Sequence, residues 1–249
     1  MVRGNTEWLA VVLLCAFLPP GPVDAEVPVN LEWRPPSQTV QVGDTVNIGL
    51  YAVCSDPNTT QSMAAMDVIF AWDPERLRLL GLDCTGAANW LYSGFPDDPY
   101  GLNETIPPQD GDGLYTALSP LGNPVHATPE GTLVTTFQFE ALSVCDLTIV
   151  DILESAGSPP AHTVVYSGDT PNTDVTGTLG HAEVTIVCQL CPGDLNGDGV
   201  IDLIDLATLL AHYDTPSGAD PWEGDLDCDG DVDLSDLAAL LAVYNTECP

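Results

Sequence analysis

Residues 193–213 read GDLNGDGVIDLIDLATLLAHY, and residues 224–244 read GDLDCDGDVDLSDLAALLAVY. Aligned without gaps at an offset of 31 residues, the two stretches are identical at 14 of 21 positions. A match of this length and register indicates an internal duplication. Each copy is an Asp- and Gly-rich loop followed by an apolar run, so the same local structure is expected twice.

Oxygen-bearing side chains occupy alternate positions of each loop, the spacing that wraps one Ca²⁺. Gly199 and Gly230 stand at loop position 6, where the sharp turn needs glycine. Position 7 offers its backbone carbonyl, and position 12 closes the shell with Asp instead of the usual, longer Glu. The expected ligands of two Ca²⁺ ions are Asp194, Asn196, Asp198, Val200, Asp202 and Asp205, and in the second copy Asp225, Asp227, Asp229, Asp231, Asp233 and Asp236. The alternative, a metal-free turn, would leave several carboxylates crowded together and repelling one another.

A helix is predicted after each loop. Leucines and one tyrosine recur at helical spacing in both copies. These residues are Leu206, Leu209, Leu210 and Tyr213 in the first copy and Leu237, Leu240, Leu241 and Tyr244 in the second. No helix is predicted before either loop, because residues 187–193 are few and contain Pro192, and Pro216 and Pro221 interrupt the linker between the copies.

A loop followed by a helix, repeated after about thirty residues, resembles a type I-like dockerin domain, and the resemblance covers residues 190–249. It implies a small all-α module that binds a cohesin-like partner protein in a calcium-dependent way. The family's contact positions are loop positions 10 and 11, which here are Leu203, Ile204, Leu234 and Ser235. Core packing between the helices is the alternative role for these side chains. The chain departs from the family pattern, since a Ser/Thr pair is common at these positions and basic residues are common later in the helix.

Residues 27–187 are predicted to form an all-β sandwich, because short runs of alternating or β-branched residues are separated by Gly and Pro clusters. The expected strands lie at residues 39–48, around a Gly43-Asp44 turn, and at residues 66–72, 132–139, 147–150 and 182–187. Three pieces resemble cohesin and carbohydrate-binding-module sandwiches: residues 40–46, 72–81 and 130–142. The resemblance implies a module that binds protein or carbohydrate.

Residues 85–114 break the regular strand spacing and contain Trp90, Tyr92, Phe95 and Tyr100. A segment of this length is commonly functional. Its aromatic residues could form a platform for sugar rings or for a partner protein, or they could fasten the segment to the sandwich, and we favour the second role.

Residues 1–25 are interpreted as a signal peptide, with Arg3, an apolar run from Trp8 to Leu18 and a cleavage site after Ala25. The run is too short to span a bilayer. The chain is therefore expected to be secreted, either extracellular or at the cell surface, where disulfides form. The expected pairs are Cys54–Cys84, Cys145–Cys188 and Cys191–Cys248, with Cys228 free.

The chain carries 37 acidic residues and 4 arginines, with no lysine, for a net charge of −33. This charge excludes nucleic acid as a partner, because nucleic-acid binding depends on Lys and Arg at phosphates. The expected function is a secreted, non-catalytic assembly protein in extracellular polysaccharide degradation, with a cohesin-like partner and a polysaccharide as a second candidate ligand.

Two alternatives stay open. The first is a polysaccharide hydrolase that carries a dockerin; it would need two carboxylates facing a cleft, and none stands out among Glu75, Asp97, Asp98, Glu104 and Glu154. The second is a structural adhesin at the cell surface whose tail is clamped by calcium.

Overall fold

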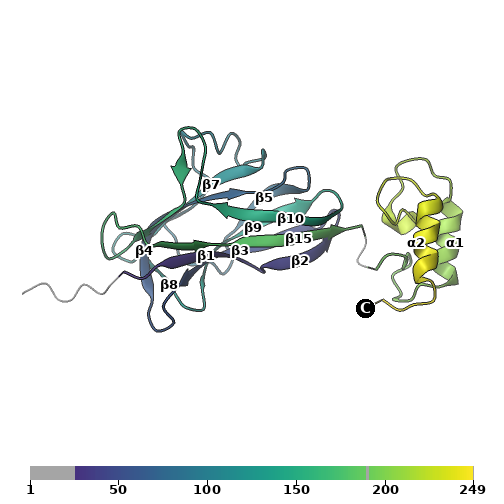
Figure 1. Cartoon of the computed structure of the whole chain (residues 1–249), viewed down its shortest axis with the longest axis horizontal. Coiled ribbons are helices and arrows are strands. Elements are labelled where there is room, and N and C mark those ends of the chain that lie inside the picture. Colours follow the sequence, from purple (N-terminus) through teal and green to yellow (C-terminus); the bar gives the residue numbers. More distant parts are fainter. Residues whose placement is uncertain (1–25, 189–190, 249) are drawn as a thin grey trace, which may run out of the picture.

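The computed structural model describes residues 26–188 and 191–248. The predicted signal peptide, residues 1–25, therefore lies outside the described residues. Within these ranges all strands lie between Val29 and Val187, and the two α-helices lie between Leu203 and Val243. Figure 1 shows the strands as one layered body and the two helices as a separate small unit. None of the helices in the described ranges is both long and apolar enough to cross a membrane.

The N-terminal region is a sandwich of two main sheets. The first sheet has the strand order β14-β1-β3-β9-β5, and the second has the order β2-β15-β10-β4-β7-β6, with β8 and β13 also paired to β4. A two-stranded hairpin, β11–β12, lies apart. The bounds are β1 Val29–Arg34, β2 Ser37–Gln41, β3 Thr45–Cys54, β4 Gln61–Ala71, β5 Leu77–Asp83, β6 Tyr92–Gly94, β7 Asp112–Leu118, β8 Val125–Ala127, β9 Thr132–Ala141, β10 Cys145–Leu153, β11 Ser155–Ala156, β12 Ala161–His162, β13 Val164–Ser167, β14 Thr176–Leu179 and β15 His181–Val187.

Every strand expected from the sequence is present, so the prediction of a β-sandwich is confirmed. The Gly43-Asp44 turn is also present: Gly43 has a φ of +86°, and the Asp44 carboxylate accepts the Gln41 amide at 2.9 Å. The strands on its two sides do not pair with each other. β2 joins β15 in one sheet and β3 joins β1 and β9 in the other, so this turn carries the chain from one layer to the next.

The core lies between the two sheets and has an aromatic centre. Phe137 on β9 contacts Phe70 and Tyr115 of the opposite sheet, with ring centroids 4.8 and 5.6 Å apart. It also meets Trp33 on β1 at 5.0 Å and Phe95 at 6.0 Å. Edge-to-face contacts of this kind add to the free energy gained by burying the rings. Phe137 thus joins both layers of the sandwich.

Replacing Phe137 with Ala should destabilise the sandwich by about 3–5 kcal/mol, because the cavity opens between the two sheets, where neither can easily collapse. Urea unfolding followed by near-UV circular dichroism measures the change. Leu121→Ala is the matched control, since Leu121 is 97% exposed and its truncation should be nearly neutral. Equal stabilities for the two variants would contradict this description of the core.

The segment 85–114 is held against the sandwich. Trp90 and Phe95 pack on the main core, and Tyr100 packs on a second buried cluster, formed by Ile69, Leu102, Leu114 and Ala161, while Tyr92 is 39% exposed. The favoured interpretation, that the aromatic residues fasten the segment, is confirmed for three of the four. The second cluster covers the outer side of β4 and β7, and the hairpin β11–β12 contributes Ala161 to it.

Candidate calcium centres

Two helices follow the two loops, as predicted. They are α1, Leu203–His212, and α2, Leu234–Val243. Asp202 and Asp233 cap them, each accepting a backbone N–H with its side chain, and Asp205 and Asp236 complete a capping box in each copy. Among the described residues no helix precedes the first loop, and only the single 3-10 turn η1, Pro221–Glu223, lies between α1 and the second loop.

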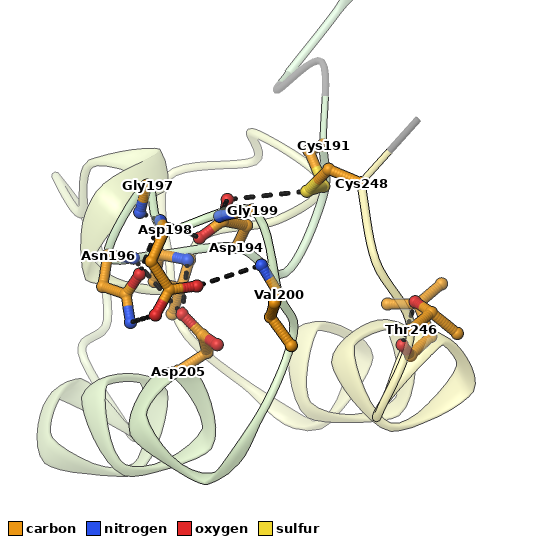
Figure 2. The surroundings of a disulfide bond; sticks show 12 residues. Cys191, Asp194, Asn196, Gly197, Asp198, Gly199, Val200, Asp205, Thr246 and Cys248 are labelled. Carbon is orange, nitrogen blue, oxygen red and sulfur yellow. Dashed lines mark hydrogen bonds between the residues drawn. A yellow bond between two sulfur atoms is a disulfide. The ribbon is translucent and has the colours of Figure 1, made fainter.

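In the first loop, Asp194 turns its carboxylate into the loop. Its Oδ1 accepts the amides of Gly197 and Asp198 at 2.8 and 3.2 Å, and its Oδ2 accepts the Gly199 amide at 2.9 Å. Asn196 donates to the Asp198 carboxylate at 3.0 Å. Figure 2 shows Asp194, Asn196 and Asp198 close to one another, with Asp205 of α1 beside them.

The second loop repeats this geometry. The Asp225 carboxylate accepts the amides of Asp229 and Gly230 at 3.2 and 3.0 Å. Carboxylate oxygens of Asp225, Asp227 and Asp229 lie within 4.8 Å of one another, and so do those of Asp231, Asp233 and Asp236. Equivalent residues therefore have equivalent roles in both copies, and the second loop has the denser set of carboxylates.

The Asp at loop position 12 is buried in both copies. Asp205 is fully buried; its Oδ1 accepts the amides of Leu195 and Asn196 at 2.8 and 3.2 Å, and its Oδ2 accepts the Asp202 amide at 2.8 Å. Asp236, only 1% exposed, accepts the amides of Leu226 and Asp233 at 2.8 and 2.7 Å. These side chains tie the start of each loop to the helix that follows it.

Burial, together with crowded negative charge, raises the pKa of two acidic side chains in the second loop. Burial is the largest cause that raises the pKa of Asp225, and the neighbouring carboxylates of Asp236 and Asp227 add to it. Burial likewise raises the pKa of Asp227, followed by the charges of Asp236 and Asp229. A divalent cation would remove this repulsion.

The residues present fit calcium. All the side-chain ligands on offer are carboxylate or amide oxygens, which Ca²⁺ prefers. Asp231 adds a specific observation: its Oδ1 is buried and has no hydrogen-bond partner in the part of the chain that the structure describes. A buried, unpartnered carboxylate oxygen is costly unless a cation satisfies it. At loop position 7, which Asp231 occupies, the sequence predicted only the backbone carbonyl as a ligand.

The two loop–helix units are interlocked. Ile201 of the first loop exchanges backbone hydrogen bonds with the segment after α2, donating to Thr246 at 2.9 Å and accepting from Asn245 at 2.7 Å. Val232 of the second loop donates to Thr215, after α1, at 3.0 Å and accepts the Asp214 amide at 2.8 Å. The unit is therefore one cooperative body in which each loop depends on the other copy.

A small core joins the helices. Leu195, Ile201, Leu209 and their counterparts Leu226, Val232 and Leu240 are buried, with Leu206 and Leu237 packed at its edge. The remaining residues of the predicted stripe are on the surface: Leu210 and Leu241 are each 52% exposed. The predicted contact positions are also on the surface, with Leu203 and Leu234 each 66% exposed, Ile204 57% exposed, and Ser235 exposed. Core packing is therefore not their role.

Two disulfides fasten this unit. Cys191–Cys248 agrees with the predicted pair, and it lies beside the first loop, where the Cys248 amide donates to the Gly199 carbonyl at 3.0 Å (Figure 2). The other predicted pairs are wrong. Cys188 is bonded to Cys228, and Cys54, Cys84 and Cys145 are free.

The errors have geometric causes. Cys54 ends β3 and Cys84 follows β5, and β9 lies between these strands. Two strand spacings exceed the reach of a disulfide. Cys145 lies opposite Ile186 on β15, so Cys188 is a diagonal neighbour beyond the strand end. Cys228 stands at loop position 4, where the first copy has Gly197, and both residues have positive φ (56° and 74°). This substitution in the aligned repeat is the signal that could have marked Cys228 as bonded.

The variant Cys228→Ser should lose about 2–4 kcal/mol of stability in the C-terminal unit, because the disulfide closes a loop of 40 residues in sequence separation. The second loop should be affected more than the first, since Cys228 lies within it. Calcium titration followed by NMR resolves the two loops. Cys84→Ser, which removes a free thiol, is the control. Peptide mapping without reductant that showed Cys228 unpaired would contradict the assignment.

The chain was compared with protein-family models, curated proteins and solved structures. No protein-family model matches it, and no curated protein matches it. Solved structures do match. The cohesin module of a family 33 glycoside hydrolase from Clostridium perfringens is 14% identical with a TM-score of 0.46, covering 64% of this chain and 97% of that chain. The sixth cohesin of scaffoldin B from Acetivibrio cellulolyticus, solved in complex with a Cel5 dockerin variant, is 13% identical with a TM-score of 0.45, covering 64% and 99%.

A third similar structure is a type III cohesin module from the cell-surface anchoring scaffoldin ScaE of Ruminococcus flavefaciens. It is 12% identical with a TM-score of 0.44, and the match covers 64% of this chain and 88% of that chain. All three matched structures are cohesins or cohesin modules.

Proposed function

We propose that this chain is an exported, non-catalytic assembly protein whose C-terminal unit, residues 190–249, binds a cohesin-like partner when Ca²⁺ is bound. The proposal rests on one observation above all: the two interlocked loop–helix units expose apolar side chains at three equivalent positions, and the first copy also exposes Ile204. The exposed residues are Leu203, Ile204, Leu210 and Tyr213 in the first copy and Leu234, Leu241 and Tyr244 in the second.

A unit of about sixty residues has few apolar residues for its core, yet these side chains stay exposed. Exposed apolar side chains that gather on one surface commonly mark a site that binds another protein. Leu203 and Leu234 directly follow the helix caps, so the position of each depends on how its calcium loop is folded. Calcium would therefore control the shape of the contact surface.

The resemblance of the repeat to dockerins supplies the identity of the proposed partner, a cohesin-like domain on another protein. The chain's own sandwich is proposed as a second interaction module. Extracellular polysaccharide degradation is the proposed setting, because that is where dockerin-bearing proteins act as a family.

The test is capture by the immobilised full chain without residues 1–25. The host's secreted and envelope proteins are passed over it in calcium, and bound proteins are released with EDTA and identified by mass spectrometry. The double variant Leu203→Asp/Leu234→Asp should retain at least about tenfold less of the released protein, because it places a desolvated charge in the apolar contact of each copy. Leu121→Asp, on the sandwich, is the matched control and should retain the wild-type amount.

Each outcome of the capture experiment points to a different function. A released protein that contains a cohesin-like sandwich supports the proposal. If the double variant and the control retain equal amounts of the released protein, Leu203 and Leu234 do not belong to the contact surface. If calcium folds the unit but nothing is retained, the unit is a structural clamp. Turnover of a dye-labelled polysaccharide by the chain would support the hydrolase instead.

A further inference from the structure

Two adjoining cavities open on the sandwich, beside the hairpin β11–β12. One has a volume of about 390 Å³ and the other about 780 Å³, and they share His162, Thr163 and Asp174 in their linings. The smaller cavity is at the lower end of the range typical of ligand pockets, about 300–1,000 Å³. We refer to the two cavities together as the acidic groove. Its charged and aromatic residues are Asp67, Tyr100, Asp151, Glu154, His162, Tyr166 and Asp174.

The smaller cavity combines two aromatic rings with two carboxylates. Tyr100 and Tyr166 line it together with Asp67 and Asp174, and Leu114 and Ala161 of the second buried cluster also line it. Tyr166 is bridged to Asp174 in the backbone, and the Tyr100 carbonyl accepts the Ser158 amide at 2.9 Å. The two aromatic residues thus come from two different segments, a turn at Tyr100 and strand β13 at Tyr166.

Within the described residues, each of the two carboxylates is hydrogen-bonded through only one of its two oxygens. Asp67 Oδ1 accepts the Thr116 hydroxyl at 2.5 Å, and Asp174 Oδ1 accepts the Thr176 amide at 2.8 Å and the Thr176 hydroxyl at 2.6 Å. The Oδ2 of each has no hydrogen bond within the described residues. Two oriented carboxylates therefore retain an acceptor oxygen for a ligand.

No basic side chain of the described chain offsets these charges. Arg34 pairs with Glu32 and lies 4.7 Å from the Tyr51 ring, Arg76 donates to Ser143 and Val144, and Arg78 pairs with Glu140. None of the three lines the groove. His162 is its one side chain able to become positive. The groove thus has a strongly negative potential, which the net charge of −33 reinforces.

We propose that the acidic groove binds a Lys or Arg side chain presented by a partner protein. An ammonium or guanidinium group is attracted to a tyrosine ring and to a carboxylate at once, and the smaller cavity offers two of each. A neutral sugar would also stack on tyrosine and donate to carboxylates, but it would leave the four negative charges of the groove unbalanced. Charge complementarity therefore favours the basic side chain.

The same argument excludes the chain's own C-terminal unit as the occupant. Residues 190–249 contain 14 acidic residues and neither Lys nor Arg. Two Ca²⁺ ions would leave this unit strongly negative. A second copy of the chain would therefore be repelled from the groove, so the groove and the C-terminal unit should serve different partners. This inference concerns the sandwich and does not depend on the function proposed for the C-terminal unit.

The test uses the full chain in calcium and capped tripeptides, acetyl-Gly-Lys-Gly-amide and acetyl-Gly-Arg-Gly-amide, with the acetyl-lysine tripeptide as the neutral probe. NMR follows the His162, Tyr100 and Tyr166 resonances. The basic peptides should shift these resonances, and neutralising the lysine should weaken binding by about tenfold, since it removes both ionic and cation–π attraction. Asp67→Asn and Asp174→Asn should each weaken binding by about fivefold.

Asp146→Asn is the matched control, because Asp146 is an exposed carboxylate on β10 outside the groove. It should change binding less than twofold, and Leu203→Asp/Leu234→Asp should have no effect, which separates this inference from the function proposed for the C-terminal unit. Equal weakening by Asp146→Asn and Asp67→Asn would show non-specific attraction and overturn the proposal. Cellotriose shifting the groove resonances while the lysine peptide does not would overturn it in favour of a sugar site.

Discussion

The variant Asp205→Ala is expected to unfold the whole C-terminal unit, both helices included. Asp205 is fully buried and accepts three backbone amides, from Leu195, Asn196 and Asp202. Hydrogen bonds to a charged group contribute about 1.5–3 kcal/mol each, so the loss of three amounts to about 4.5–9 kcal/mol. A core of this size rarely supplies more than about 3–5 kcal/mol, and the variant also removes an expected ligand of the first calcium site, so the remaining interactions should not hold the fold.

Far-UV circular dichroism of the full chain in calcium measures this loss as a drop in helix signal. The control is Glu247→Ala, which removes an exposed carboxylate from the same unit and should keep the signal. Asp236→Ala should behave like Asp205→Ala because it is the equivalent residue, and Asp205→Asn should lose less because its amide oxygen can still accept. Wild-type helix content in Asp205→Ala would show that the buried carboxylate does not hold the loop.

Removal of calcium is expected to unfold the same unit and leave the sandwich intact. A ligand at a thousand times its dissociation constant stabilises the folded state by about 4.1 kcal/mol per site, hence about 8 kcal/mol for two sites. Binding and folding should be coupled, because without the ions the carboxylates of each loop repel one another. The interlocked backbone bonds of Ile201 and Val232 should make the loss cooperative.

The stability of the metal-free C-terminal unit should depend on pH in a defined direction. Burial and neighbouring charge raise the pKa of Asp225 and Asp227 in the folded, metal-free unit. A raised acid pKa means that the folded state binds protons more tightly, so its contribution to stability is present at low pH and is lost as pH rises through the raised values. In EDTA, the helix signal should therefore recover partly as pH falls from neutrality toward the ordinary Asp range, about 3.9.

The measurement is a calcium titration of the chelated protein, followed by helix signal and by near-UV dichroism of the sandwich. Asp194→Ala and Asp225→Ala should each weaken calcium binding and loosen the unit, as their positions at the start of the loops imply. If either variant binds calcium with the wild-type affinity, the assignment of that residue as a calcium ligand is refuted. A helix signal that is unchanged in EDTA at neutral pH would refute the coupling of metal to folding.

Much of the candidate site was predictable because its information is local. Alternate oxygen ligands, a glycine at the sharp turn and a helix after the loop all lie within about twenty residues, and the second copy repeats them. The buried role of Asp205 was not predictable, since its partners Leu195 and Asn196 are brought to it only when the loop closes. The unpartnered oxygen of Asp231 likewise appears only in the folded loop.

The cysteines show the limit of reasoning from spacing. Cys191–Cys248 was predicted, but Cys54 and Cys84 are kept apart by a strand between them, and strand order is a non-local property. Similarly, the strands on either side of Gly43-Asp44 were predicted, but their separation into two sheets was not, because the pairing partners come from the far end of the domain.

The sequence by itself determined the two loop–helix units, the strands of the sandwich and the acidic charge, because periodicity, turn chemistry and the spacing of oxygen-bearing side chains are local and are written in consecutive residues. The tertiary structure alone decided which cysteines meet, how each loop pairs with the other copy, and which leucines stay in solvent. It also brought Asp67, Tyr100 and Asp174 to one groove from segments far apart in the chain. These arrangements follow from packing and strand order, which no local pattern specifies.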